Sequence, residues 1–501
     1  MENTLRGSRP TTSFAALVLV LAVLTTQFVG LGREVIDPDE TTFILMGADV
    51  ANGHLPFVNQ FDLKPPVIFL LIGGVLAAFG KSLVAVRLLG DFLLFGTALL
   101  TFSFARQIAS GWAALGGALI YVAFASLDLG QPTYTELPAL FFAMAALLAL
   151  ARTPVAPLRA GLAGLFLALA VLSRTNLYQL PIAFGLLLLI ASLRKSDMVH
   201  PRAWLAFGMG GLVPVALLVI AYGLAQQLAV LKLAMIDVPL AYAAQVGPGE
   251  AILENIRQLY VTATIEPLIL IPFAVLVAAG LWGAFVRRQA QPWPLLVATL
   301  ALAGLLVSLA FSGAVYPHYW LQIGPVLALF AALGLDRLAR LPKATPLALA
   351  AGTLPLAAAV AEQLPQGIAV VTDPSHTESA FEIAQAARFI KSNGRSHPSV
   401  WPWRKQLIDW YLDAPQLSKA GVQPENIARP AIIGPLAKAG YVGSDEIGRL
   451  MAMRPDFVVT DGQGKGLAWM RATGRPVDQW LAQNYELEAQ FGDVLVYRRV
   501  N

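Results

Sequence analysis

Long apolar runs fill the first three quarters of the chain. A helix needs roughly 20 apolar residues to cross about 30 Å of hydrocarbon, or somewhat fewer where flanking side chains reach the interface. By this criterion the sequence predicts eleven membrane spans. They are residues 13–31, 83–105, 111–127, 136–151, 159–173, 181–193, 203–225, 266–286, 293–312, 319–336 and 345–362.

A twelfth apolar run, residues 66–80, is short and begins at a pair of prolines. Short loops rich in basic residues favour the cytoplasmic side of a membrane. The basic loops of this chain can all lie on that side only if the run 66–80 does not cross the membrane. We therefore predict a re-entrant or interfacial helix here, with the amino terminus in the cytoplasm and the carboxyl terminus outside. The basic residues that set this orientation are Arg6, Arg9, Arg106, Arg152, Arg159, Arg194, Lys195, Arg287, Arg288, Arg337, Arg340 and Lys343.

The first span is expected to stay in the protein rather than to be cleaved as a signal peptide. No small-residue cleavage site follows Gly30, and further spans come after it.

Beyond residue 365 the pattern becomes that of a soluble α/β domain. Short apolar segments at 368–371, 456–460 and 493–499 predict strands, and 378–390 has helical periodicity. We therefore predict two domains. They are a transmembrane domain over 1–364, with long external loops at 32–65 and 226–265, and an external α/β domain over 365–501.

Composition supports this division and excludes several classes of protein. Only 13% of the 501 residues are charged and 57% are hydrophobic, whereas soluble domains carry about 25% charged residues. A net charge of +4 is too small to indicate a nucleic-acid partner. The absence of cysteine excludes disulfides and thiolate chemistry, and five histidines without a His-Glu-x-x-His pattern give no indication of a zinc site.

The first external loop contains the acidic string DPDE. Asp37 can cap a helix that starts at Pro38, with Glu40 as its capping-box partner and a short surface helix over 41–52. Asp39 has no part in that cap. Because three carboxylates beside a bilayer are costly unless a cation or a reaction needs them, we expect a function here, which is compatible with capping.

Three more charged residues fall in loops predicted to lie on the same face. Lys64 either reaches the lipid headgroups or holds an anionic group facing Asp39. Glu136 either starts a helix, where the dipole favours it, or forms a second acidic site. Arg174 ends a span on the side where the positive-inside tendency disfavours it, and an external anion such as a phosphate would explain it.

An aromatic string with one histidine follows near residue 318. Tyr316, Tyr319 and Trp320 fit an aromatic interface belt. His318 fits a belt less well and could hydrogen-bond a phosphate or a sugar. The glycine-rich segment 462–466 misses the dinucleotide-binding spacing, so we interpret it as a turn.

Together these motifs resemble the GT-C class of membrane glycosyltransferases, in particular the bacterial aminoarabinose transferase (ArnT) and protein O-mannosyltransferase branch. The resemblance rests on DPDETTFILMGADVANGHLP after the first span, Lys-Pro-Pro at the end of that loop, the acidic residue in YTELP, the basic residue in LSRTN and the string YPHYWLQIGP, in that order. It implies a fold of about 11–13 transmembrane helices with a soluble external domain.

The resemblance implies transfer of a sugar from a polyprenyl-phosphate carrier to an acceptor at the outer face of the membrane. Within the Asp-Glu pair, Asp39 and Glu40, Asp39 matches the position proposed as the base, and Glu136 matches the second acidic motif. The residues expected near the carrier phosphate and in the same cavity are Lys64, Arg174, His318 and Tyr319.

Two positions depart from the aminoarabinose pattern, so the resemblance does not name the sugar. Phe43 stands where those enzymes tend to have tyrosine, and Leu63 stands where an acidic residue often precedes Lys-Pro. Together these departures also weaken the case for a metal in that loop. Asp37, Asp39 and Glu40 could ligate a divalent cation, but fixed Lys and Arg side chains can neutralise the phosphate, so no cofactor or metal is expected.

The chemistry is consistent with this set of residues. A sugar phosphate already has a good leaving group, since the second pKa of a phosphate monoester is about 6. A carboxylate base near the acceptor hydroxyl and fixed cations near the phosphate therefore suffice for one inverting displacement. The expected acceptor is a lipid or envelope glycan, such as lipid A or lipopolysaccharide. The expected location is a bacterial inner membrane, with a periplasmic carboxyl-terminal domain.

Three alternatives remain open at this point. The first is an enzyme of the protein O-mannosyltransferase type, with a protein acceptor. The second is a transporter or flippase of envelope intermediates, although transporters place charges within spans, and here the acidic groups cluster in loops. The third is a non-catalytic scaffold whose tail is a binding module.

Overall fold

The computed structural model describes residues 10–127, 132–244, 248–286, 293–311, 316–341, 343–393 and 398–500. Four of the basic residues used to orient the chain, Arg6, Arg9, Arg287 and Arg288, lie outside the described residues. The chain forms two compact units. The helical unit comprises Met1–Val29, Arg87–Ala221 and Val246–Ile368, and the mixed unit comprises Gly30–Val86, Tyr222–Gln245 and Ala369–Asn501.

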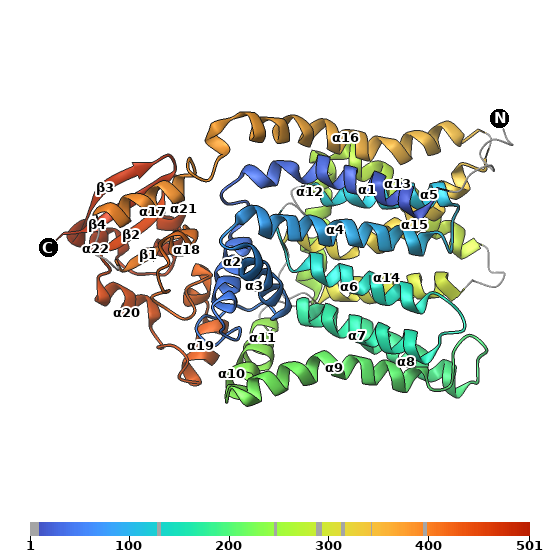
Figure 1. Ribbon diagram of the computed structural model, residues 1–501, viewed down its shortest axis with the longest axis horizontal. Coiled ribbons are helices and arrows are strands. Elements are labelled where there is room, and N and C mark those ends of the chain that lie inside the picture. Colours follow the sequence, from blue (N-terminus) through green and yellow to red (C-terminus); the bar gives the residue numbers. More distant parts are fainter. Residues whose placement is uncertain are drawn as a thin grey trace. The chain divides into compact units, whose positions relative to one another are not determined.

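The helical unit consists of long apolar helices that pack side by side, as α6 does with α7 and α13 with α15 (Figure 1). Its elements are α1 (Thr12–Gln27), α4 (Leu83–Ala105), α5 (Gly111–Ala125), α6 (Glu136–Leu150), α7 (Pro157–Ser173), η2 (Thr175–Leu177), α8 (Gln179–Leu193), α9 (Ala203–Leu224), α12 (Pro248–Ile265), α13 (Pro267–Val286), α14 (Trp293–Ala310), η4 (Pro317–Ile323), α15 (Gly324–Leu338) and α16 (Thr345–Thr372).

Each of the eleven predicted spans is helical, which confirms a polytopic α-helical membrane protein. Three of them are shorter apolar helices, namely α5, α6 and α7. In the described part of the chain, eight stretches are long and apolar enough to cross a membrane. They are Thr12–Gly32, Leu83–Ala105, Thr175–Leu193, Ala203–Leu224, Pro267–Ala284, Trp293–Ala310, Pro317–Leu338 and Thr345–Val370.

Glycines let α13 and α15 approach closely. A Cβ atom on Gly280 would collide with the carbonyl oxygen of Phe330, and one on Gly334 would collide with that of Leu276. Membrane helices often associate through such small residues, because van der Waals contact replaces the hydrophobic driving force that is absent in lipid.

The mixed unit joins the first long loop to the tail. Its elements are η1 (Phe28–Gly32), α2 (Pro38–Ala51), α3 (Val67–Phe79), α10 (Leu228–Lys232), the π-helical turn η3 (Leu233–Asp237), α11 (Val238–Ala243), η5 (Pro374–His376), α17 (Glu382–Asn393), β1 (Val400–Pro402), α18 (Leu407–Leu412), η6 (Pro424–Ala428), α19 (Pro430–Lys438), α20 (Glu446–Met453), β2 (Phe457–Asp461), α21 (Lys465–Ala472), α22 (Val477–Asn484), β3 (Tyr485–Phe491) and β4 (Val494–Arg499).

Helices α2 and α3 pack closely at Gly47 and Gly73. A Cβ atom on Gly73 would lie 3.0 Å from the carbonyl oxygen of Gly47 and would also collide with Val50. Helix α3 spans only 13 residues, so it is shorter than the eight span-length stretches. The predicted helix over 66–80 is therefore present, and its placement in a membrane stays a prediction.

The tail folds around a four-stranded sheet of order β1-β2-β4-β3, in which only β1 and β2 are parallel. The loop and the tail are tied by Glu34, whose carboxylate accepts the backbone N–H groups of Ile383 and Ala384, each at 2.8 Å, in the first turn of α17. Burial raises the pKa of Glu34 above its ordinary value, an effect that these two hydrogen bonds oppose.

Two of the three predicted strands are confirmed and one is wrong. Strand β2 (Phe457–Asp461) and strand β4 (Val494–Arg499) match the predictions at 456–460 and 493–499. The segment 368–371 is helical instead, because α16 continues to Thr372. A run of four apolar residues is compatible with either state, and here the preceding helix extends through it.

The glycine-rich segment 462–466 forms the start of α21, as a turn that Asp461 closes. The carboxylate of Asp461 accepts the N–H of Lys465 at 2.7 Å and that of Gly466 at 2.6 Å. Gly464 has a φ of 74°, which favours glycine. The N–H groups of Lys465 and Gly466 at the start of α21 are therefore already bound by the Asp461 side chain and are not available to an anion.

Candidate active site

Asp37 is the cap of α2, as the sequence predicts, whereas the reciprocal capping contact of Glu40 stays a prediction. Asp37 has an extended backbone, and its side chain accepts the N–H of Asp39 at 2.7 Å. Pro38 is the first helical residue. Capping places Asp39 and Glu40 in the first turn of α2, where the helix dipole stabilises a carboxylate. Glu40 is buried, with 1% of its surface exposed.

Both carboxylate oxygens of Asp39 have a donor. Oδ2 accepts from Nζ of Lys64 at 2.8 Å, and Oδ1 accepts from Nε2 of Gln423 at 3.1 Å. The side chains of Asp39 and Lys64 are 19% and 23% exposed, so the ion pair is partly shielded from solvent and still accessible. Lys64 thus pairs with Asp39 itself, and its predicted role of holding a separate anionic group, such as the carrier phosphate, stays a prediction.

Lys64 is positioned from two sides. Its backbone N–H donates to Oδ2 of Asp62 at 3.1 Å, and Asp62 also accepts from Nδ2 of Asn426 at 3.3 Å. The ammonium group lies 5.6 Å from the ring centre of Phe43. Phe43, which departs from the aminoarabinose pattern, thus supplies a cation–π contact to Lys64.

Gln423 is held in the orientation that this geometry requires. Its Oε1 accepts from the hydroxyl of Thr42 at 2.8 Å, so Nε2 faces Asp39. Thr42 and Asp39 lie one turn apart on α2, whereas Gln423 belongs to the tail. Sequence reasoning missed Gln423, Thr42 and Asn426, because no local pattern links a polar side chain in the tail to a loop far away in the chain.

The helical unit contains a second polar cluster, at the start of α6 and the end of α7. Glu136 is the first residue of α6 and is 1% exposed. Its Oε1 lies 2.7 Å from Nη1 of Arg174, the residue that follows α7. Arg174 also donates to Gln322 at 3.1 Å and to Thr135 at 3.3 Å.

Aromatic rings surround this ion pair. The guanidinium carbon of Arg174 lies 4.1 Å from the ring centre of Tyr319. His318 stacks on Tyr134 with 4.4 Å between ring centres, and its Nε2 is 3.7 Å from Oε1 of Glu136. His318 and Tyr319 therefore belong to a shielded set of ionic, amide and aromatic groups, and the exposed Tyr316 stacks on His318 beside it.

The structure thus places the predicted residues in two groups. Asp39, Glu40 and Lys64 belong to the mixed unit. Glu136, Arg174, His318 and Tyr319 form the cluster in the helical unit. In the described ranges, no three His, Asp or Glu side chains gather closely enough to hold a metal ion.

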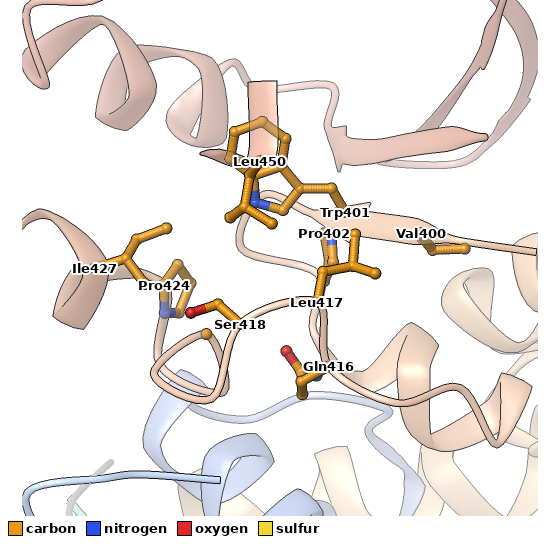
Figure 2. Close-up of a pocket in the computed structure, with 10 residues that line it drawn as sticks. Val400, Trp401, Pro402, Gln416, Leu417, Ser418, Pro424, Ile427 and Leu450 are labelled. Atoms are coloured by element: carbon orange, nitrogen blue, oxygen red, sulfur yellow. The ribbon is translucent and has the colours of Figure 1, made fainter. Parts of the chain in front are cut away.

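A small cavity in the tail does not extend either group. Figure 2 shows it beside Trp401, Pro402 and Leu450, with Ser418 among the lining side chains. Its volume is about 10 Å³, which is room for one water molecule and not for a sugar.

The helical bundle with its soluble tail defines a GT-C-type membrane fold. ArnT from Cupriavidus metallidurans, solved bound to undecaprenyl phosphate, matches with a TM-score of 0.62 and 14% identity, covering 97% of this chain and 98% of that one. The archaeal oligosaccharyltransferase AglB from Archaeoglobus fulgidus, solved with an inhibitory peptide and a dolichol-phosphate, matches with a TM-score of 0.51 and 12% identity, covering 98% of this chain and 74% of that one. No protein-family model matches the sequence, and no curated protein matches it.

Proposed function

We propose that this chain is a membrane glycosyltransferase that moves a sugar from a polyprenyl-phosphate donor to an acceptor hydroxyl. The observation that carries the proposal is the Asp39 carboxylate, which is partly exposed and oriented by one donor on each oxygen. The likeness to ArnT over almost the full length of both chains supports the donor class, since that structure holds undecaprenyl phosphate.

Asp39 acts as the base in this proposal. The acceptor oxygen forms a bond to the anomeric carbon while its proton passes to Asp39, and the bond from that carbon to the phosphate oxygen breaks with its electron pair. Because the departing phosphate is a weak base, no acid is needed to protonate it. Lys64 holds the carboxylate in place until the acceptor hydroxyl replaces it at one oxygen.

Arg174 binds the donor phosphate in this proposal. Its Nε and Nη1 groups are taken by Gln322, Thr135 and Glu136, and in the described part of the chain Nη2 has no such partner. A guanidinium fixed on the face of Tyr319 presents a planar fork that suits phosphate oxygens. Glu136 offsets the charge of Arg174 when no donor is bound, and His318 supplies a further polar group.

We also propose where the reaction takes place. The acidic loop and the tail lie outside the cytoplasm, on the periplasmic face of a bacterial inner membrane, and the acceptor is a lipid or an envelope glycan. The tail over 365–501 positions the acceptor, and the hydrogen bond from Gln423 to Asp39 supports this role.

The test is mass spectrometry of envelope lipids and glycans from cells that carry wild type, Asp39→Asn or Asp49→Asn at matched expression. Asp49 is the matched control, because it lies on the same helix and holds His54 and Asn59 instead of Lys64. We expect Asp39→Asn to remove one sugar from one species and to accumulate the polyprenyl-phosphate sugar, with Asp49→Asn like wild type. Unchanged lipids, glycans and glycoproteins in Asp39→Asn would contradict the proposal.

The stereochemistry provides a second test. One direct displacement inverts the configuration at the anomeric carbon. A product with the donor's configuration would overturn the mechanism with Asp39 as base, even if sugar transfer itself were established.

A further inference from the structure

A cavity of about 590 Å³ opens in the helical unit where several helices end or begin. Ala151 follows the last residue of α6, Arg159 lies in the first turn of α7, and Trp293 is the first residue of α14. The volume falls within the range of pockets that hold small ligands.

This cavity is separate from the Glu136–Arg174 cluster. Glu136 is the first residue of α6 and the cavity adjoins the last, and a helix of 15 residues is about 22 Å long. None of the residues that line the cavity belongs to the cluster or to the Asp39 site.

Two arginines make the cavity positively charged. Arg152 and Arg159 both line it, and no aspartate or glutamate does. Arg159 is held by a hydrogen bond from Nη1 to the carbonyl oxygen of Arg152 at 3.1 Å. Over the ranges that the structure describes, neither guanidinium forms an ion pair with a carboxylate.

Gln107 adds a donor that the protein leaves unused. Its Nε2 is buried, and among the described residues it has no hydrogen-bond partner. A buried amide without a partner is costly, so a ligand that accepts a hydrogen bond there would be stabilised.

Apart from Thr153, the rest of the lining is apolar. Trp293 is 8% exposed, and its indole N–H donates to the carbonyl oxygen of Leu150 at 2.7 Å. Pro294 and the half-exposed Met198 continue this wall. This lining suits a ligand that combines an anionic group with an apolar body.

We propose that this cavity binds the phosphate headgroup of an anionic membrane phospholipid. Two guanidinium forks match phosphate oxygens, and the ends of apolar helices are where phospholipid headgroups lie. The apolar wall favours a lipid over free phosphate, because the glycerol and acyl carbons would cover it. The inference does not depend on the proposed sugar transfer.

The experiment measures lipid retention by native mass spectrometry on the full chain. Protein is taken from membranes with equal parts of phosphatidylcholine and phosphatidylglycerol, with and without an excess of inorganic phosphate. The variant is Arg152→Gln with Arg159→Gln. The matched control is Arg194→Gln with Arg202→Gln, which removes the same charge at two positions that do not line the cavity.

We expect wild type and control to retain phosphatidylglycerol, and the variant to lose roughly ten- to thirtyfold of that affinity. Inorganic phosphate should not displace the lipid. Displacement by phosphate would make this a site for a soluble anion and would overturn the proposal. An equal loss in the control, or no preference for phosphatidylglycerol in wild type, would overturn it as well.

A cross-linking measurement decides the question if the double variant does not fold. A photoreactive residue at Met198, in an otherwise unchanged chain, should capture phosphatidylglycerol above its share of the membrane. The same residue at Met209, 70% exposed within α9, should capture the two lipids in proportion to their abundance. Proportional capture at Met198 would contradict the proposal.

Discussion

Gln423 donates a hydrogen bond of 3.1 Å to Asp39, although 384 positions separate the two residues. The other carboxylate oxygen is bound by Lys64, from the same loop as Asp39. One residue of the tail and one of the loop therefore fix the plane of this carboxylate together, so the tail contributes directly to the candidate active site.

Gln423→Leu should slow sugar transfer by about ten- to a hundredfold, because a misplaced base loses much of its proximity advantage. The loss should appear in kcat, with little change in the KM of the lipid donor. Gln490→Leu is the matched control, since the side chain of Gln490 is exposed on strand β3 and donates to the nearby carbonyl of Gly492. An unchanged kcat in Gln423→Leu would show that Lys64 alone orients Asp39.

Arg174→Met should destabilise the helical unit by about 3–5 kcal/mol, because Glu136 would remain as a buried charge without its partner. Arg174→Met with Glu136→Gln should cost clearly less than the sum of the two single changes. Denaturant unfolding of the purified chain measures this coupling. The exposed pair Glu254 and Arg257 serves as control, and the same changes there should cost less than about 1 kcal/mol.

Asp409 should make the mixed unit more stable in acid than at neutral pH. Burial raises the pKa of Asp409 well above its ordinary value, and a hydrogen bond from Gln416 offsets only part of this effect. A raised pKa in the folded state gives stability that is fully present below the unfolded pKa of about 4 and is lost as the pH rises through the folded pKa.

Asp409→Asn removes this dependence, because the amide cannot ionise and still accepts from Gln416. Its Tm should match that of wild type near pH 4 and exceed it increasingly toward pH 8.

Asp445→Asn should behave in the opposite way, since the backbone N–H of Gly448 holds the pKa of Asp445 below its ordinary value. That variant should be less stable than wild type at neutral pH, and the difference should shrink as the pH falls through the pKa of Asp445, because wild type then loses the contribution of the carboxylate. Parallel pH profiles for Asp409→Asn and wild type would contradict the assignment.

Asp461→Ala should cost about 1–2 kcal/mol, because it removes the acceptor for two N–H groups at the start of α21. Hydrogen exchange at the amides of Lys465 and Gly466 should quicken accordingly. Gln463→Ala, at an exposed position in the same turn, should leave exchange unchanged. Equal exchange in Asp461→Ala and wild type would show that the turn, and not the carboxylate, protects these amides.

The sequence predicted the features that depend on local chemistry. Asp37 and Pro38 start α2 because capping acts between neighbouring residues, and the apolar periods that define spans need no knowledge of partners. The segment 368–371 was mispredicted as a strand because four apolar residues do not carry a period long enough to distinguish strand from helix. Strand β1 escaped prediction for a similar reason, since it has only three residues.

The partners of the candidate site residues could not be predicted in the same way. Gln423 and Asn426 are ordinary polar residues in a loop-rich part of the tail, and only the folded chain brings them to Asp39 and Asp62. The ion pair between Arg174 and Glu136 could not be predicted from the sequence either. The sequence indicated each residue separately, because each is predicted to lie at a membrane face.

Gly47 and Gly73 allow α2 and α3 to pack closely, because a side chain at either position would collide with the facing helix. Asp39 lies in the first turn of α2, and Lys64 lies shortly before α3 begins at Val67. The close packing of these two helices therefore helps to bring Asp39 and Lys64 together. In the proposed mechanism, the acceptor hydroxyl takes the place of the Lys64 ammonium group at one oxygen of Asp39, so the Lys64 side chain is the part of this site that has to move during each reaction.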